Sequence, residues 1–197
     1  MCLSLVGSEM CIRDRLNIGN LYVNRNQIGA IVGSQPFGGE GLSGTGPKAG
    51  GPNYIKRFIM SEKNEWVKPK LDNSVSLDIL QAAINKLNNH KKRLKSHKLP
   101  GPTGESNVLS FYSRGVVLCI GPTFDMALLQ AQTAKENGCS TLIITEDAEG
   151  ESTIKGSLNR ADLQFLNGFD AVVAWSDEED QRDILRTLAS RPGPIIP

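Results

Sequence analysis

From residue 115 onward, continuous apolar runs alternate with helical segments, and this alternation limits the fold more than any other feature. The runs GVVLCIG, STLIITE and FDAVVAW suit strands, TFDMALLQAQTAKENG is a capped helical segment, and DEEDQRDILRTLAS is an acid-led one. Strands that are apolar throughout are buried on both faces, as in parallel sheets covered by helices. We therefore predict an α/β fold with a Rossmann-like unit over residues 107–197. The final GPIIP is expected to begin a fourth strand that the chain does not complete, so this domain would be incomplete.

The preceding residues, 61–106, are expected to be a linker followed by one helix. SEKNEWVKPKLDN is polar and contains Pro69, which favours a connection. One helical face would then carry Leu77, Leu80, Ile84, Leu87 and Leu94. The basic run HKKRLKSHK at 90–98 would lie at the end of this helix, where cations complement the helix dipole. LPGPTGESN at 99–107 would close the helix.

Ahead of this helix, β-prone runs flank a glycine-rich stretch. Leu21–Asn24 and Ile28–Val32 are short runs joined by an Asn-rich turn, which predicts two short strands. PNYIKRFIM at 52–60 mixes large apolar residues with Lys56 and Arg57, which is typical of an edge strand.

The glycine-rich stretch QPFGGEGLSGTGPKAGGP at 35–52 has three possible interpretations: a phosphate cradle, a flexible linker, or a rigid loop shaped around a substrate. GEGLSG fits the G-x-G-x-x-G pattern, but Pro47 and Pro52 prevent the helix that a phosphate site needs after Gly44. A flexible linker lacks apolar anchors, whereas IGAIVGS precedes this stretch and YIKRF follows it. We therefore expect an ordered loop.

Composition argues against several classes of partner. The 197 residues carry 22 basic and 21 acidic side chains, a net charge of +1, so no electrostatic argument favours nucleic acid. No apolar run approaches the length of a membrane span. The four cysteines lack metal-binding spacing, which favours free thiols in the cytoplasm.

Side chains that commonly carry catalysis are sparse. His90 and His97 have no cysteine or serine at a recognisable spacing, so we expect surface histidines. Cys119 and Cys139 have no base beside them in the sequence, which favours structural thiols. The acidic clusters DAEGE and SDEED lie at a turn and at a helix start, where carboxylates are common without any metal.

A nucleotide site in the Rossmann-like unit stays an alternative. IGPTFDMA leads from a strand into a helix N-terminus, and Glu146 follows the next strand, where an acid can bind a ribose. Because Gly121 is the one glycine of that turn, the glycine fingerprint is missing, and the predicted fold says little about cofactor binding.

The N-terminal third shows a family resemblance. GNLYVNRNQIGAIVGSQPFGGEGLSGTGPKAGGPNYIKRF, residues 19–58, resembles the C-terminal end of the catalytic domain of L-glutamate γ-semialdehyde (Δ1-pyrroline-5-carboxylate) dehydrogenases, in the aldehyde dehydrogenase superfamily. GNLYVNRN with GGEGLSGTGPKAGGP is similar to the bifunctional proline utilisation A (PutA) proteins. LPGPTGE and the Rossmann-like segment look like the non-catalytic C-terminal domain of the longer forms. Residues 16–60 would thus end a catalytic domain, and 107–197 would be the truncated C-terminal domain.

The resemblance implies a substrate site in the first of these segments. In the family, backbone amides ahead of PFGG receive the α-carboxylate of the aldehyde substrate, and the matching positions are Gly29 and Ala30. The aromatic residue that packs on the substrate's methylene groups corresponds to Phe37. The alternative for Phe37 is ordinary core packing. Fixed backbone donors are suited to binding an anion.

The resemblance also implies what the chain does not supply. The nucleophilic cysteine, the general-base glutamate and the NAD-binding fold are expected upstream of residue 19, and the FAD-dependent proline dehydrogenase domain of the bifunctional proteins is expected to be absent from this chain. The expected partners are L-glutamate γ-semialdehyde, the remainder of the parent polypeptide and further copies in a homo-oligomer. Alternatively, the segment after residue 60 is a non-catalytic lid or assembly module. Residues 1–15, MCLSLVGSEMCIRDR, resemble translated sequencing adapter and are expected to be a non-native start.

Overall fold

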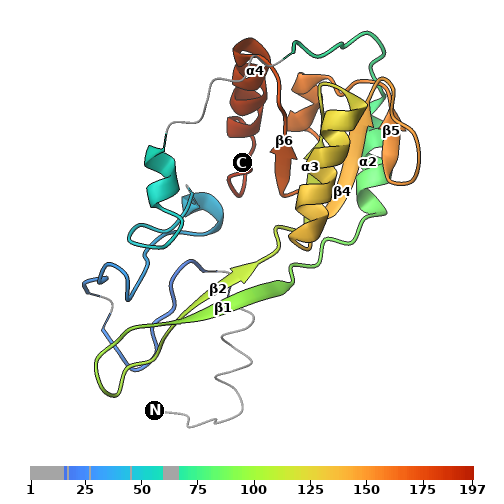
Figure 1. Cartoon of the computed structure of the whole chain (residues 1–197). Coiled ribbons are helices and arrows are strands. Elements are labelled where there is room, and N and C mark those ends of the chain that lie inside the picture. Colours follow the sequence, from blue (N-terminus) through green and yellow to red (C-terminus); the bar gives the residue numbers. More distant parts are fainter. Residues whose placement is uncertain (1–15, 17, 27, 45, 60–66) are drawn as a thin grey trace. The chain divides into compact units, whose positions relative to one another are not determined.

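A computed structural model describes residues 16–197 except 17, 27, 45 and 60–66 (Figure 1). The expected non-native start, 1–15, lies outside the described residues. The chain forms two compact units. The first contains the residues up to 60 with 98–109 and 193–195, and the second contains 61–97, 110–192 and 196–197. The domain boundaries predicted from the sequence stay predictions.

A four-stranded parallel sheet forms the centre of the second unit and confirms the predicted fold class. Its order is β5-β4-β3-β6, and every neighbouring pair is parallel. Counted along the chain, the strands follow the order third, second, first, fourth, which matches the first four positions of the Rossmann order 3-2-1-4-5-6. The strands are β3 (Val116–Cys119), β4 (Ser140–Thr145), β5 (Thr153–Lys155) and β6 (Ala171–Val173). The short β5 was not predicted.

Both helices predicted within residues 107–197 are present, and each begins at a side-chain cap. Helix α3 spans Phe124–Glu136, and the Thr123 hydroxyl accepts a hydrogen bond from the Met126 amide. Helix α4 spans Glu178–Ala189, and the Asp177 carboxylate accepts from the Asp180 amide. Such caps satisfy backbone donors that a helix start leaves free.

Alternate residues of each strand face opposite layers. On one face, Val116 and Leu118 of β3 pack with helix α2 (Leu77–Asn85), α4 and the 3-10 helix η3 (Arg160–Gln164). On the other face, Val117 and Cys119 pack with α3. All four side chains are at most 4% exposed, and burial of an aliphatic side chain contributes about 1.5–3 kcal/mol. The sheet is therefore a layer between helices, as its continuous apolar strands predict.

The helix predicted before this sheet is shorter than expected, which corrects the sequence analysis. Helix α2 ends at Asn85, and the basic run forms strand β1 (Arg93–Leu99) beside β2 (Asn107–Tyr112). Consequently LPGPTGESN is the loop of a hairpin and does not close a helix. The two Asn residues at 88 and 89 favour helix ends, and pairing with β2 then outweighs the helical spacing of Leu94.

The strands predicted in the first unit are also wrong. Leu21–Asn24 and the described residues of Ile28–Val32 form no strand, and the predicted edge strand contains the 3-10 helix η2 (Ile55–Phe58). Ile28 and Val32 are each 83% exposed, and no strand among the described residues pairs with them. Strand propensity depends on such neighbours. The C-terminal GPIIP forms no strand either, although the Val172 amide of β6 donates to the Pro197 carbonyl at 3.0 Å.

No helix in the described part of the chain is long and apolar enough to cross a membrane.

Candidate functional site

The predicted anchor residues Gly29 and Ala30 lie in an exposed segment of the first unit. Gly29 has φ +76°, a left-handed conformation that glycine adopts readily. Neither backbone amide donates a hydrogen bond to any of the described residues. These two donors are therefore open to an external acceptor such as a carboxylate.

The residues that follow form a tight turn closed by Gln35. The Ile31 carbonyl accepts from the backbone amides of Ser34 (3.2 Å) and Gln35 (2.7 Å). The Ile31 amide in turn donates to the Gln35 side-chain oxygen at 3.3 Å. Gln35 thus holds both polar groups of Ile31, next to the open amide of Ala30. We call residues 29–35 the anchor loop.

A carboxylate from the hairpin loop lies beside this turn and was missed by the sequence analysis. Oε1 of Glu105 accepts hydrogen bonds from Gln35 Nε2 (2.7 Å), Arg25 (3.1 Å) and Asn107 Nδ2 (2.8 Å). Gln35 is only 6% exposed, so its amide depends on this partner. In the sequence, Glu105 is the acid that ends the motif LPGPTGE. A single acid in a loop belongs to no periodic pattern, so the sequence could not predict its contacts.

Phe37 lies just after the anchor loop, on a two-residue antiparallel bridge. Its amide and carbonyl exchange hydrogen bonds with Ala49, at 3.0 and 2.8 Å. The Phe37 ring is 54% exposed, so the alternative of core packing does not describe it. The anchor loop is fastened to the same stretch, because the Gly33 amide donates to the Gly50 carbonyl at 3.0 Å. No hydrogen bond joins Phe37 to Gly29 or Ala30 among the described residues.

Lys48 and Asn20 fix the backbone around Phe37. The Lys48 ammonium donates to the carbonyls of Gly19 and Gly38, and the Asn20 side chain bonds the Pro36 carbonyl and the Gly38 amide. Burial lowers the pKa of Lys48, and the charge of Glu40 opposes this shift. Hydrogen bonds therefore fix the backbone on both sides of Phe37, at Pro36 and at Gly38.

The described residues of the glycine-rich stretch form a loop, and its role as a rigid loop shaped around a substrate stays a prediction. A 3-10 turn, Gly41–Ser43, precedes Gly44, and residues 46–54 form no helix that could receive a phosphate. A side chain at Gly39 would meet the Ser43 carbonyl oxygen at 2.2 Å. Close backbone contact of this kind explains the glycine.

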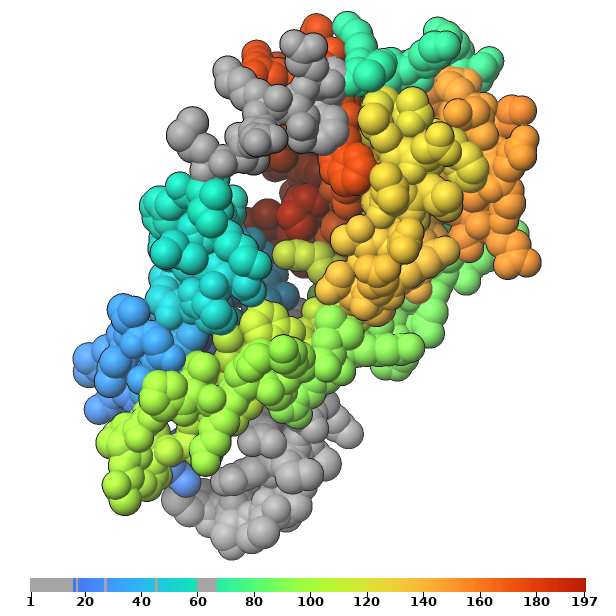
Figure 2. Space-filling model, viewed as in Figure 1, coloured from blue at the N-terminus to red at the C-terminus, as the bar shows by residue number. Residues whose placement is uncertain are grey.

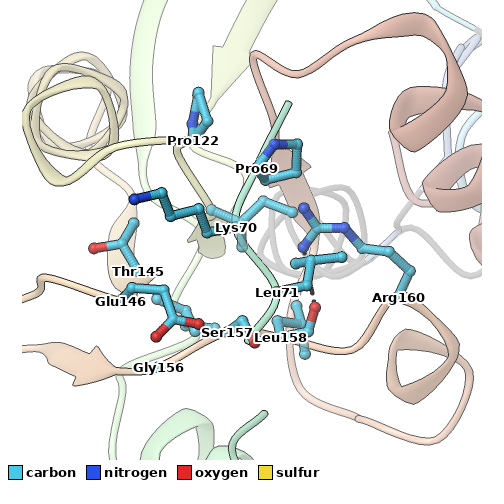
Figure 3. A pocket seen from close by; sticks show the side chains of 12 residues that line it. Pro69, Lys70, Leu71, Pro122, Thr145, Glu146, Gly156, Ser157, Leu158 and Arg160 are labelled. Atoms are coloured by element: carbon cyan, nitrogen blue, oxygen red, sulfur yellow. Dashed lines mark hydrogen bonds between the residues drawn. The ribbon is translucent and has the colours of Figure 1, made fainter. Parts of the chain in front are cut away.

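The second unit offers a small pocket at the carboxyl ends of β3, β4 and β5, where Rossmann folds bind nucleotides (Figure 3). Residues 69–75, which we call the cover segment, cross these strand ends and form the surface there (Figure 2). The Asn73 carbonyl accepts from the Ser157 amide at 2.7 Å, and the Val75 amide donates to the Ser157 carbonyl at 3.0 Å. The chain itself therefore occupies much of this position.

Glu146 and Gly121, considered as nucleotide-binding residues, both have partners within the second unit. The two Glu146 carboxylate oxygens accept from the amide and the side chain of Asn73, at 2.9 and 2.7 Å. The Gly121 amide faces the Gln130 side-chain oxygen at 3.3 Å, and its carbonyl accepts from the Trp175 amide at 3.1 Å. Glu146 is therefore already bonded to the chain's own cover segment at the strand end where a ribose would bind.

Other candidate catalytic residues do not form a site. His97 stacks edge-on against Phe111 with ring centroids 5.8 Å apart, and His90 is exposed. Cys119 is fully buried, and burial raises the pKa of its thiol to about 12. Among the described residues, no group of three or more His, Cys, Asp or Glu side chains could hold a metal ion.

The sequence is similar to proteins of known class. The chain is 34% identical over 91% of its length to the bifunctional protein PutA of Klebsiella aerogenes, and 32% identical over 94% to that of Rhizobium meliloti. A quarter of the chain is 60% identical to the 1-pyrroline-5-carboxylate dehydrogenase of Bacillus thuringiensis. No protein-family model matches the chain.

These similarities place the chain in the aldehyde dehydrogenase superfamily. Within that superfamily, the chain belongs to the family of the 1-pyrroline-5-carboxylate dehydrogenases and the bifunctional PutA proteins. The chain spans 16–17% of the length of the PutA proteins it matches.

Proposed function

We propose that the first unit provides the carboxylate anchor of an NAD-dependent dehydrogenase that oxidises L-glutamate γ-semialdehyde to glutamate in proline catabolism. The observation that carries this proposal is the pair of open, exposed amides at Gly29 and Ala30. They lie in a loop whose next residues are held by hydrogen bonds. Two fixed donors can bind the substrate's α-carboxylate and hold its aldehyde end in one direction.

Phe37 has a complementary role in this proposal. Its exposed ring follows the anchor loop, where it can pack on the methylene groups between carboxylate and aldehyde. NAD accepts the hydride in the complete enzyme. We assign no NAD, FAD or metal ligand to this chain. The nucleophile and general base belong to other parts of the full-length protein, and we expect the 197-residue chain alone to be inactive, since positioning without a nucleophile gives no covalent step.

The direct test is Ala30→Pro in a full-length protein that contains this segment. Proline removes one anchor amide, which should weaken transition-state binding of glutamate semialdehyde by about 1.5–3 kcal/mol. The measurement is kcat/KM for glutamate semialdehyde and for propanal, which has no carboxylate. An equal loss for both aldehydes in a folded variant would show that the loop is only structural.

A non-catalytic role for the second unit is the alternative, as a lid or assembly module of the larger protein. It is favoured by the cover segment, which lies across the strand ends, and by the bonds that tie Glu146 to Asn73 of this segment. Deletion of residues 110–197 from the full-length protein distinguishes the roles. A change in the molecular mass by light scattering supports assembly, whereas an unchanged mass with altered KM supports a lid.

A further inference from the structure

The anchor loop needs support from outside its own sequence. Its open amides are exposed, and the segment lacks a strand ladder among the described residues. Ile31, next to Ala30, is held through the side chain and backbone of Gln35. The Gln35 side chain therefore helps to position the Ala30 end of the loop, while the Gly33 amide fastens its other end to the Gly50 carbonyl at 3.0 Å.

Among the described residues, the side-chain amide of Gln35 donates to one acceptor, Glu105. The Gln35 Nε2 to Glu105 Oε1 distance is 2.7 Å, and Gln35 is 6% exposed. Because a buried amide group is costly without a partner, this bond fixes which way the Gln35 oxygen points. With Nε2 on Glu105, the oxygen points to the Ile31 amide.

The other flank of the anchor loop reaches the same carboxylate. Arg25, four residues before Gly29, donates to Glu105 Oε1 at 3.1 Å, and both side chains are about three-quarters buried. Glu105 thus links Arg25, which precedes the loop, to Gln35, which closes it. A partly buried ion pair is less screened by solvent than a surface pair.

Glu105 is itself firmly placed. Its amide donates to the Pro102 carbonyl at 3.0 Å in a turn that needs Gly104 at φ +88°. Asn107 bridges the Pro100 carbonyl and the Glu105 carboxylate, at 2.9 and 2.8 Å. The hairpin loop therefore delivers the carboxylate as a preorganised group. All of these residues belong to the first unit.

We propose that Glu105 is a positioning residue for substrate binding, which acts through Gln35 and Arg25 to hold the anchor loop. This inference rests on the proposed function of Gly29 and Ala30. Glu105 touches no substrate in this scheme. Its loss should allow the loop to move, so that the two amides no longer meet the substrate carboxylate together.

The experiment compares Glu105→Ala, Glu105→Gln and the control Glu151→Ala in a full-length protein that contains this segment. Glu151 is an exposed glutamate that bonds to no other described residue. We expect Glu105→Ala to raise KM for glutamate semialdehyde about tenfold with kcat little changed, and to leave kcat/KM for propanal within about twofold. Glu105→Gln keeps the acceptor for Gln35 and should recover part of the loss. Glu151→Ala should change neither substrate.

Ala30→Pro in the same assay separates the two proposals. If Ala30→Pro discriminates between the aldehydes and Glu105→Ala does not, the inference is overturned and the proposed function stands. If Ala30→Pro lowers both equally, the proposed function fails and the inference fails with it.

A second measurement does not depend on activity. In the 197-residue chain, hydrogen exchange at the Ile31 amide should be faster in Glu105→Ala than in the unsubstituted chain and unchanged in Glu151→Ala. Unaltered exchange at Ile31 in a folded Glu105→Ala chain would overturn the positioning role.

Discussion

Asn73 donates both its backbone amide and its side-chain amide to the two carboxylate oxygens of Glu146, at 2.9 and 2.7 Å. Glu146 follows β4, at the strand end where a dinucleotide fold places an acid for a ribose. Here the same position binds the chain's own cover segment. A fold can thus keep its architecture while the position of its usual ligand site is used for a contact within the chain.

This contact predicts a pH-dependent stability of the second unit. Hydrogen bonds from the Asn73 side chain and amide lower the pKa of Glu146 below its ordinary value of 4.5. A lowered folded pKa stabilises the fold above the ordinary value, and this contribution is lost as the pH falls through the folded value. Glu146→Gln should therefore lower the urea midpoint at pH 7, and the difference from the unsubstituted chain should shrink below about pH 4.

Glu149→Gln is the matched control, because Glu149 is an exposed glutamate three residues away with no bond to the described chain. It should leave the urea midpoint unchanged at both pH values. A Glu146→Gln effect of the same size at pH 7 and at low pH would show that the carboxylate charge does not hold the cover segment.

The buried pair Arg160–Asp180 predicts a large stability loss when one partner is removed. The guanidinium donates two hydrogen bonds to the carboxylate, at 2.7 and 2.9 Å, and both residues are buried. Burial alone would raise the pKa of Asp180, but hydrogen bonds and the charge of Arg160 hold it below its ordinary range. Arg160→Ala leaves an unpaired buried carboxylate and should lower the free energy of unfolding by about 3–5 kcal/mol, measured by urea denaturation.

The control for this change is Arg182→Ala. Arg182 pairs with Glu178 on the exposed face of α4 at 3.3 Å, and solvent reaches most of both side chains. Exposed pairs contribute about 0–1 kcal/mol. Equal losses for Arg160→Ala and Arg182→Ala would contradict the buried-pair argument.

Cys119 and Cys139 should differ in their reactivity with iodoacetamide. The Cys119 thiol is fully buried and burial raises its pKa to about 12, so almost no thiolate forms at pH 8. Cys139 is partly exposed at the start of β4. In a Cys2→Ser, Cys11→Ser background, mass spectrometry should detect alkylation of Cys139 in the native chain and of both thiols in urea. Native alkylation of Cys119 at the rate of Cys139 would contradict this placement.

The fold was predictable where burial dictated it. Strand β3 is apolar at every position, β4 has the apolar run Leu142–Ile144 at its centre, and helices α3 and α4 carry side-chain caps, so pattern and propensity agree. Prediction failed where pairing decided the outcome. The basic run at 90–98 has a leucine at helical spacing, yet β2 pairs with it as a strand. The runs around Ile28 resemble strands, but no partner strand lies beside them among the described residues.

The candidate site divides in the same way. The sequence supplied Gly29, Ala30 and Phe37 through a family resemblance, because short motifs carry that information. Glu105 could not be placed, since its partner Gln35 lies 70 residues away and hydrogen bonds between loops leave no periodic signal. The hypothesis that Glu146 binds a ribose was based only on its position after a predicted strand. Nothing in the sequence indicated that Asn73 of the cover segment would be its hydrogen-bond partner.

Phe37→Leu provides the last prediction and tests the second half of the substrate site. Leucine keeps an apolar side chain on the bridge with Ala49 but loses part of the ring's contact area, which should cost about 1 kcal/mol of transition-state binding for a substrate with a methylene chain. In a full-length protein that contains this segment, kcat/KM should fall about fivefold for glutamate semialdehyde and hexanal and stay near its original value for acetaldehyde. Phe58→Leu is the control, because Phe58 is a similarly exposed aromatic of the same unit that stacks on Tyr54. If Phe37→Leu reduces acetaldehyde turnover as much as that of the longer substrates, the ring supports the loop and does not bind the substrate chain.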